Sequence, residues 1–224
     1  MLAVQPGTRS NIMKILTRLL TAFAALSLMA GAANVSAQEA PDALVKRISQ
    51  EVLDIAKADK EIQGGNQKRV LELVDAKVLP YVNFEHMTSL AASRYWREAT
   101  PAQQKALIAE FRTLLVYTYS GAIAQVKDQT LEFKPLGGDA TDTDVVVRSQ
   151  VARAGGEPIQ LNYRLEKLPG GWKIYDVNVL GAWLVETYKG NFSAEISKGG
   201  VDGLLATLKK KNEQLAAKTL RNGK

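Results

Sequence analysis

The chain has no cysteine among its 224 residues and only one histidine, His86. Without cysteine there are no disulfide bonds, no thiol catalysis and no thiolate metal sites, so stability has to come from a buried core. A single histidine also argues against a zinc site, which needs several protein ligands. We interpret His86 as a partly exposed residue at the start of a helix.

Familiar catalytic motifs are also absent. The sequence contains no G-x-S-x-G, P-loop or dinucleotide-binding fingerprint. Asp176, which interrupts the apolar stretch WKIYDVNV, is open to two interpretations. In an apolar pocket its pKa would rise, and it could act as a general base. Strand alternation favours the other interpretation, in which Asp176 and Asn178 lie on a solvated face while Tyr175, Val177 and Val179 point inward.

Long hydrophobic runs are missing except near the start of the chain. There Lys14 and Arg18 are followed by LLTAFAALSLMAGAA and by small residues up to Ala37. A basic segment, an apolar run and an A-x-A-like site are typical of a secretory signal peptide, and the run is too short for a stable membrane span. We predict cleavage after Ala37, with Met13 a candidate start, and export to a bacterial periplasm.

Positive charge is less abundant than the net value suggests. Removal of residues 1–37 takes away Arg9, Lys14 and Arg18 and no acidic residue, which lowers the net charge from +6 to +3. This weakens the case for nucleic-acid binding. The remaining residues, 38–224, have the length of one domain with a substantial core.

Hydrophobic periodicity indicates helices first, then strands, then helices again. Helical spacing occurs over 44–55, 70–78, 84–91, 101–124, 184–196 and 204–208, and alternation over 131–133, 145–151, 159–165 and 172–179. Thr100-Pro101-Ala102-Gln103 has the pattern of a capping box, and glycine pairs mark turns at Gly137-Gly138, Gly155-Gly156 and Gly199-Gly200. This order predicts an α+β domain whose helices pack on one face of a twisted antiparallel sheet of about four strands.

Three segments resemble the MlaC family, the toluene-tolerance auxiliary proteins that carry phospholipid. They are VLPYVNFEHMTSLAASRYWREATPAQQKALIAEFRTLLVYTY (78–119), GWKIYDVNVLGAWLVETYKGNF (171–192) and GGVDGLLATLK (199–209). The resemblance extends over nearly all of residues 40–210. Trp183 stands where many relatives have serine, a difference that would narrow the space nearby.

The resemblance implies a cystatin/NTF2-like fold with an apolar cavity between helices and sheet. It also implies a periplasmic phospholipid shuttle between the outer and inner membranes, serving an ABC transport system that maintains outer-membrane lipid asymmetry. Its implied partners are an outer-membrane lipoprotein–porin complex and an inner-membrane ABC transporter complex with an MCE-domain subunit. Phospholipid is the implied ligand, with no cofactor and no enzymatic activity.

Periodicity within the resembling segments gives a set of candidate lipid-binding residues. The set is Val82, Phe84, Met87, Leu90, Tyr95, Phe111, Leu115, Tyr119, Val147, Leu161, Tyr163, Tyr175, Val177, Val179, Leu184 and Phe192. Two other functions stay open. One is an isomerase- or hydratase-type enzyme with an NTF2-like pocket, Asp176 as base and Tyr175 as acid. The other is a periplasmic holdase or adaptor that offers apolar surface to proteins.

Overall fold

The computed structural model describes residues 38–137, 139, 141–152 and 157–222. The predicted signal segment 1–37 lies outside these residues, as do the predicted turn at 155–156 and half of the turn at 137–138. Contacts divide the chain between Gln38 and Glu39, and every element below belongs to the unit that begins at Glu39.

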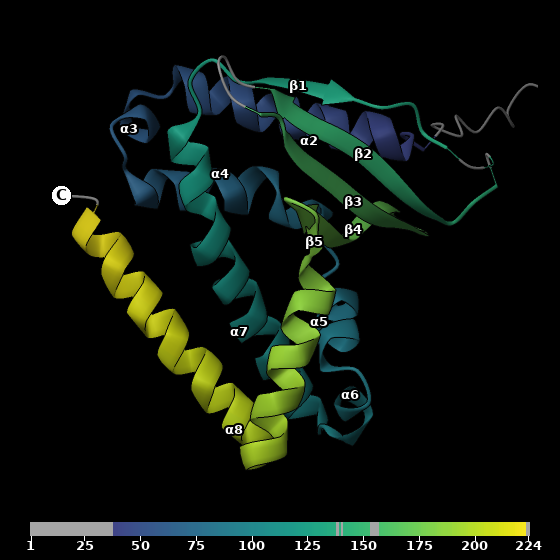
Figure 1. The fold of residues 1–224 in the computed structure, drawn as a ribbon, viewed down its shortest axis with the longest axis vertical. Helices are drawn as coiled ribbons and strands as arrows, with labels where there is room; N and C mark the ends of the chain where they lie inside the picture. Colours follow the sequence, from purple (N-terminus) through teal and green to yellow (C-terminus); the bar gives the residue numbers. More distant parts are fainter. Residues whose placement is uncertain (1–37, 138, 140, 153–156, 223–224) are drawn as a thin grey trace, which may run out of the picture. The chain divides into compact units, whose positions relative to one another are not determined.

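Six helical elements precede the central helix α7, most of them visible in Figure 1. They are α2 (Pro41–Ala58), α3 (Lys60–Gln63), α4 (Gln67–Lys77), the 3₁₀ turn η1 (Leu79–Tyr81), α5 (Phe84–Ala92) and α6 (Tyr95–Glu98). Asp59, Asn66 and Asn83 cap the N-termini of α3, α4 and α5 by accepting backbone N–H bonds. The predicted helical stripes are therefore present, and the first lies wholly within α2.

The central helix α7 (Pro101–Tyr119) starts with the predicted capping box, in which the side chains of Thr100 and Gln103 each bond the other's backbone N–H. The chain then continues as the 3₁₀ helix η2 (Ser120–Gln125). The prediction of an α-helix reaching Ala124 was thus wrong after Tyr119. Gly121 lowers helix propensity there, and the Gln63 side chain holds the far end of the segment by donating to the Val126 carbonyl at 2.8 Å.

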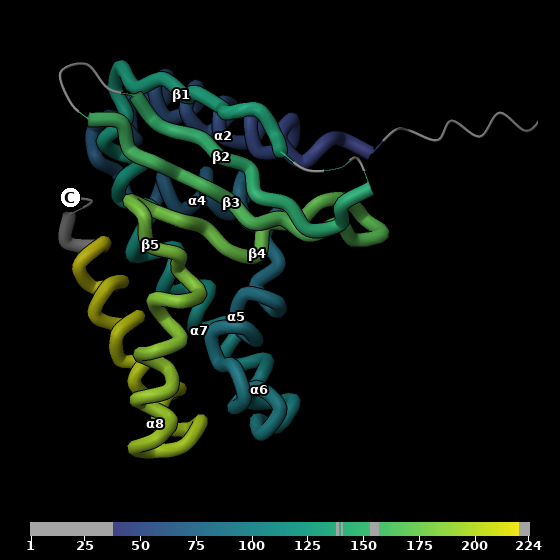
Figure 2. The backbone as a smooth tube through the Cα atoms, turned by 45° about the vertical axis from the view of Figure 1, so that its right-hand side comes forward, coloured from purple at the N-terminus to yellow at the C-terminus, as the bar shows by residue number. Residues whose placement is uncertain are grey.

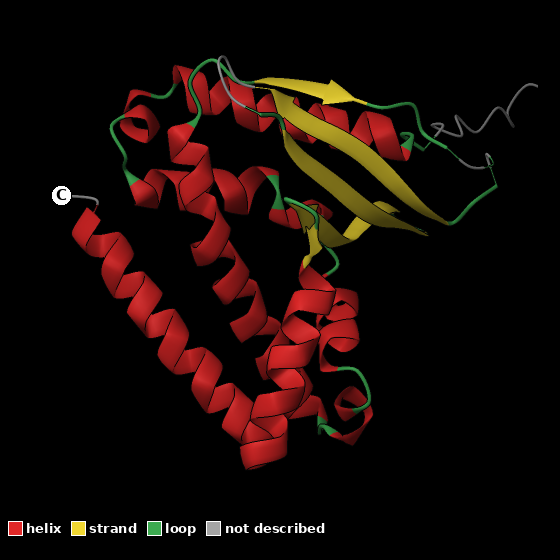
Figure 3. Ribbon diagram, in the orientation of Figure 1, coloured by secondary structure: helices red, strands yellow, loops and turns green. Residues whose placement is uncertain are grey.

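The sheet contains five antiparallel strands in sequence order (Figure 3). They are β1 (Thr130–Phe133), β2 (Asp144–Ala152), β3 (Ile159–Leu168), β4 (Gly171–Val179) and β5 (Ala182–Trp183). The antiparallel meander and the α+β class are confirmed. The two-residue β5 is too short to give an alternation signal, and sequence analysis missed it.

The two faces of the sheet follow from its register. Val147, Tyr163 and Val177 form one cross-strand row on the face that we call the inner face, while Val146, Arg164 and Asp176 form a row on the outer face. A β-bulge interrupts the pairing of β3 with β4. Arg164 pairs with Asp176, but the next residue, Leu165, pairs with Ile174. Tyr175 is the extra residue, and the bulge changes where its side chain points.

Helix α2 covers one end of the inner face. Leu44, Val45 and Ile48 pack with Val147 and Leu165 and with other inner-face residues in one buried cluster. A second cluster joins α5, α7 and α8. The two clusters come close at Val82 and Val177, which contact both.

The last element, α8 (Leu184–Asn222), consists of two helical arms. Gly199 and Gly200 interrupt the helical backbone, as the sequence predicted, and Gly200 has a φ of 68°, which glycine adopts without strain. The first arm leads away from β5, and the second turns back from the kink at an angle to the first (Figures 1 and 2). Both arms pack on α7 through residues that include Phe192 and Leu204.

Candidate functional site

An apolar cavity of about 340 Å³ lies between the inner face of the sheet and the helices. Its wall includes residues from α4, η1, α5, α7, η2, β3, β4 and the first residue of α8. The lining residues are Val74, Val78, Leu79, Val82, Phe84, Met87, Leu115, Val116, Tyr119, Ser120, Ala122, Ile123, Leu161, Tyr163, Val177, Val179 and Leu184.

Hardly any polar side chain reaches this cavity. Only Ser120, Tyr119 and Tyr163 carry side-chain oxygens among the lining residues. Burial raises the pKa of Tyr163, whose hydroxyl also interacts with Ser49 and Ser149. Tyr119 is 36% exposed and Ala122 is exposed, so the cavity approaches solvent on their side. The wall suits an apolar guest and has no group placed for acid–base chemistry.

Most of the predicted lipid-binding residues meet around this one cavity. Those that line it are Val82, Phe84, Met87, Leu115, Tyr119, Leu161, Tyr163, Val177, Val179 and Leu184. They come from segments far apart in the sequence, and antiparallel register and helix packing bring them together. Their contact with lipid stays a prediction.

Four other predicted residues lie in the packed interior or at the surface instead. Phe111 and Phe192 are buried against each other between α7 and α8, with ring centroids 5.0 Å apart. Val147, only 1% exposed, is covered by α2 at the other end of the inner face. Leu90 is 37% exposed on α5. Periodicity identified the correct face in the buried cases, but it does not show whether that face meets a neighbour or an open space.

Tyr95 also lies away from the cavity. Its hydroxyl accepts a hydrogen bond from Arg94 at 2.7 Å and lies 3.4 Å from the Ser197 hydroxyl on α8. Hydrogen bonds from Ser197, Arg94 and Ser193 lower the pKa of Tyr95 to about 8. Tyr95 therefore links α6 to α8 at the surface.

The bulge places Tyr175 outside the cavity. Its hydroxyl donates to Asp144 at 2.7 Å, and its ring stacks on His86 with centroids 4.6 Å apart. Burial and the carboxylate of Asp144 raise the pKa of Tyr175. His86 in turn lies 2.9 Å from Glu166, which also accepts from Asn83. The prediction that Tyr175 faces inward was wrong, and these contacts hold the start of α5 against the sheet.

The prediction of a solvated face at Asp176 and Asn178 was also wrong. Their exposures are 0% and 4%, because β5 and the start of α8 fold over this part of the outer face. Asp176 Oδ2 accepts from Arg164 at 3.0 Å, and Oδ1 accepts from the backbone N–H groups of Val177 and Val185. Burial raises the pKa of Asp176, against the opposing effects of these donors. We call Asp176, Arg164 and the Val185 N–H group the outer clasp.

Trp183 belongs to this outer side as well. Its ring centroid lies 4.0 Å from the guanidinium carbon of Arg164, in a cation–π contact. Trp183 is not among the residues that line the cavity. The expectation that it narrows the nearby space was therefore wrong.

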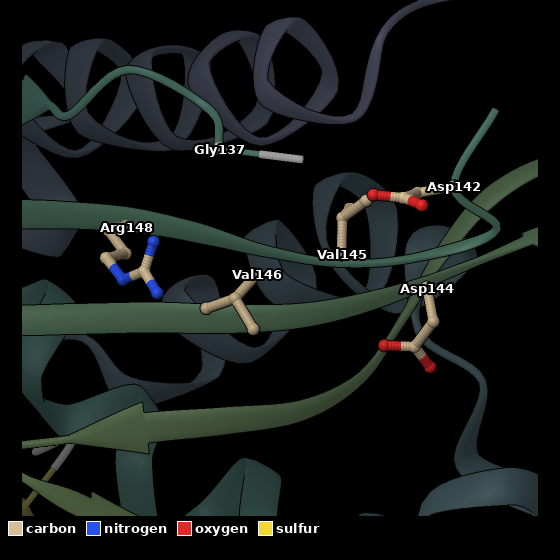
Figure 4. Close-up of a pocket in the computed structure, with 6 residues that line it drawn as sticks. All are labelled: Gly137, Asp142, Asp144, Val145, Val146 and Arg148. Atoms are coloured by element: carbon tan, nitrogen blue, oxygen red, sulfur yellow. The ribbon is translucent and has the colours of Figure 1, made fainter. Parts of the chain in front are cut away.

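A second depression, of about 280 Å³, lies along β2 and the loop before it (Figure 4). Val146 stands between Asp144 and Arg148 in its wall, and Asp142 and Gly137 complete one side. Charged groups of both signs line it, so it does not suit an acyl chain.

Several cavity residues were not predicted. Val74, Val78 and Leu79 come from α4 and the turn after it, and Val116, Ser120, Ala122 and Ile123 come from the end of α7 and from η2. Val74 and Val78 do belong to a helical stripe in the sequence. The η2 residues fall within the helical spacing predicted over 101–124, but the change from α to 3₁₀ geometry alters which of them face the sheet.

The described part of the chain contains neither a candidate metal site nor a candidate membrane span. No group of three or more histidine, aspartate and glutamate residues within it is arranged to hold a metal ion. None of its helices combines the length and hydropathy that a membrane span requires.

Comparison with known proteins gives consistent matches. The family model of MlaC protein matches residues 46–210. The intermembrane phospholipid transport system binding protein MlaC of Haemophilus influenzae is 23% identical over 89% of this chain and 92% of its own length. The toluene tolerance protein of Pseudomonas putida is 26% identical over 74% of this chain and 77% of its own. A solved structure, the phospholipid-binding protein from Ralstonia solanacearum in complex with a phospholipid, is 48% identical, with a TM-score of 0.75, over 78% of this chain and 98% of its own.

Proposed function

This chain belongs to the MlaC family, and we propose that it is a periplasmic phospholipid carrier. It shuttles phospholipid between the outer and inner membranes as the soluble component of an ABC transport system that maintains outer-membrane lipid asymmetry. Its partners are an inner-membrane ABC transporter complex with an MCE-domain subunit and an outer-membrane lipoprotein–porin complex. Cleavage after Ala37 releases residues 38–224 as a single lipid-binding domain.

The apolar cavity is the observation that carries this proposal. Two acyl chains contain about 30 methylene groups, and their exposure to water would cost on the order of 25 kcal/mol. Unassisted passage through an aqueous compartment is therefore negligible. A wall of valine, leucine and phenylalanine side chains offers acyl chains an apolar environment like that of the bilayer interior. Because these contacts have no directional bonds, the acyl chains can enter and leave. The volume of about 340 Å³ lies at the lower end of the range of small-molecule sites, roughly 300–1,000 Å³, so the cavity has to widen to hold two acyl chains.

An enzyme built on Asp176 and Tyr175 finds no support in the geometry. A general base must reach the proton that it removes, and neither side chain lines the cavity. Both carboxylate oxygens of Asp176 already accept hydrogen bonds, and the Tyr175 hydroxyl donates to Asp144. The raised pKa of Asp176 accompanies a structural contact between β4 and α8.

The test is extraction of the gently purified protein with organic solvent, followed by mass spectrometry. We expect diacyl phospholipid at near-stoichiometric amount. Val177→Phe should lower the bound lipid about tenfold, because the larger ring fills the cavity. Val146→Phe is the matched control, with the same substitution on the outer face of the sheet. It should leave the bound lipid unchanged.

A protein that carries no lipid and takes none from vesicles would overturn the proposal. Equal lipid content in the Val177→Phe and Val146→Phe variants would show that the lipid lies elsewhere. Preference for unfolded proteins over phospholipid would favour a holdase.

A further inference from the structure

The turn between β4 and β5 has a residue that its geometry does not favour. Val179 pairs with Ala182, which leaves Leu180 and Gly181 as a two-residue hairpin connection. Their φ angles are 52° and 88°. Positive φ at both central positions is characteristic of a type I′ turn, in which Asn-Gly is strongly preferred. Leucine at the first position is conformationally unfavourable, so local structure does not explain its presence.

Leu180 is also the most exposed of the large hydrophobic side chains in the described residues. It is 72% exposed, whereas Leu90, Leu136 and Tyr119 are 36–37% exposed. The next two residues of the turn, Gly181 and Ala182, are exposed as well. An isolated surface leucine needs no explanation, but one held in a strained position does.

Two groups suited to a membrane interface follow the turn on the outer face, Trp183 in β5 and Arg164, which contacts it. Trp183 is partly buried, with its ring against the guanidinium group of Arg164. Arg164 donates to Asp176 through one nitrogen, and its side chain remains 38% exposed. Tryptophan favours the headgroup level of bilayers, and a guanidinium group with free N–H donors binds phosphate.

The turn also connects directly to the cavity. Val179 and Leu184, which flank it in the sequence, both line the cavity wall. Residues 179–184, VLGAWL, include no charged side chain. The exposed turn therefore adjoins the cavity wall at both of its ends, with no charged side chain within residues 179–184.

We propose that residues 180–183 form a membrane-contact tip that inserts Leu180 into the boundary between headgroups and acyl chains of a phospholipid bilayer. Trp183 lies at headgroup level, and Arg164 contacts lipid phosphate. This placement brings the cavity wall next to the lipid that enters or leaves. The inference rests on the proposed carrier function, and it adds direct contact with the bilayer.

The substitution Leu180→Asn tests membrane contact without destabilising the turn. It creates the preferred Asn-Gly turn, so the melting temperature should stay the same or rise. The same change removes the apolar side chain that inserts. Leu136→Asn is the matched control, since it removes a partly exposed leucine from the segment between β1 and β2.

Insertion can be measured with a fluorophore, because the chain has no native cysteine. Ala182→Cys labelled with an environment-sensitive dye keeps Leu180 in place. Vesicles of phosphatidylethanolamine and phosphatidylglycerol at 3:1 should shift its emission to the blue. Leu180→Asn in this background should weaken vesicle binding, and slow lipid transfer from the vesicles, by about tenfold. Leu136→Asn should change neither.

Failure of this inference is distinguishable from failure of the carrier function. If the purified protein contains phospholipid but the dye does not respond to vesicles, the proposed contact with the bilayer is wrong. The exposed turn would then be a candidate contact for a protein partner. Equal vesicle binding by the wild type and Leu180→Asn also overturns it. Absence of lipid from the protein and from all transfer assays contradicts the carrier function instead.

Discussion

The two faces of β4 differ in the kind of interaction that they make. On the inner face, Val177 and Val179 offer only carbon atoms to the cavity. On the outer face, Asp176 and Asn178 are buried and hydrogen bonded. Apolar contacts have little directional preference and tolerate a variable guest, whereas hydrogen bonds fix positions. The comparison indicates that the outer face holds the wall in place while the inner face stays permissive.

The largest effect is expected from breaking the outer clasp. Asp176→Ala leaves two backbone N–H groups without their buried acceptor, whereas water can solvate Arg164, whose side chain is 38% exposed. The loss of both acceptor contacts should destabilise the fold by about 2–4 kcal/mol. Urea denaturation measures the change. Asp176→Asn retains an acceptor oxygen and should lose much less. A loss below about 1 kcal/mol in the alanine variant would show that the clasp does not hold the fold together.

An intermediate loss of stability should distinguish the packed part of the inner face from the part that lines the cavity. Val147 and Val177 lie in the same cross-strand row, but α2 covers Val147 and the cavity lies over Val177. Val147→Ala should cost about 2 kcal/mol, because it leaves a void in packed surroundings, and Val177→Ala about 1 kcal/mol or less. Thermal and urea unfolding of both variants check the difference. Equal losses would mean that the inner face is packed uniformly.

The smallest effect is expected at the bulge. Tyr175→Phe removes the hydrogen bond to Asp144 but keeps the ring on His86, so it should cost about 1 kcal/mol. Asp144 is exposed and can be solvated in the variant. Urea denaturation is again the measurement, and lipid content should be unchanged. Loss of bound lipid in this variant would contradict the placement of Tyr175 outside the cavity.

Local signals predicted most of the fold. The capping box at Thr100–Gln103 and the alternation of residues 159–165 act over a few residues, so the sequence reveals them directly. Face assignment was also correct for Val177 and Val179. Such signals depend on backbone geometry alone, which explains their success.

Distant segments decide the features that were not predicted. Asp176 is buried because residues 182–185 fold back over it, and its alternating neighbours contain no sign of this cover. The sequence likewise gives no sign of the bulge at Tyr175. Phe111 and Val147 were expected in the cavity because periodicity gives the direction of a side chain but not what lies opposite.

The edge of β4 opposite β3 is covered along much of its length. Val82 forms a parallel bridge with Ile174 and the N–H group of Asn83 donates to its carbonyl, while β5 pairs with the other end of the strand. These covers leave β4 little unpaired backbone that could recruit a strand from another molecule. The covering segments continue directly into Phe84 and Leu184 of the cavity wall. Displacing them to widen the cavity would also expose a strand edge, so resistance to aggregation limits how far the cavity can open.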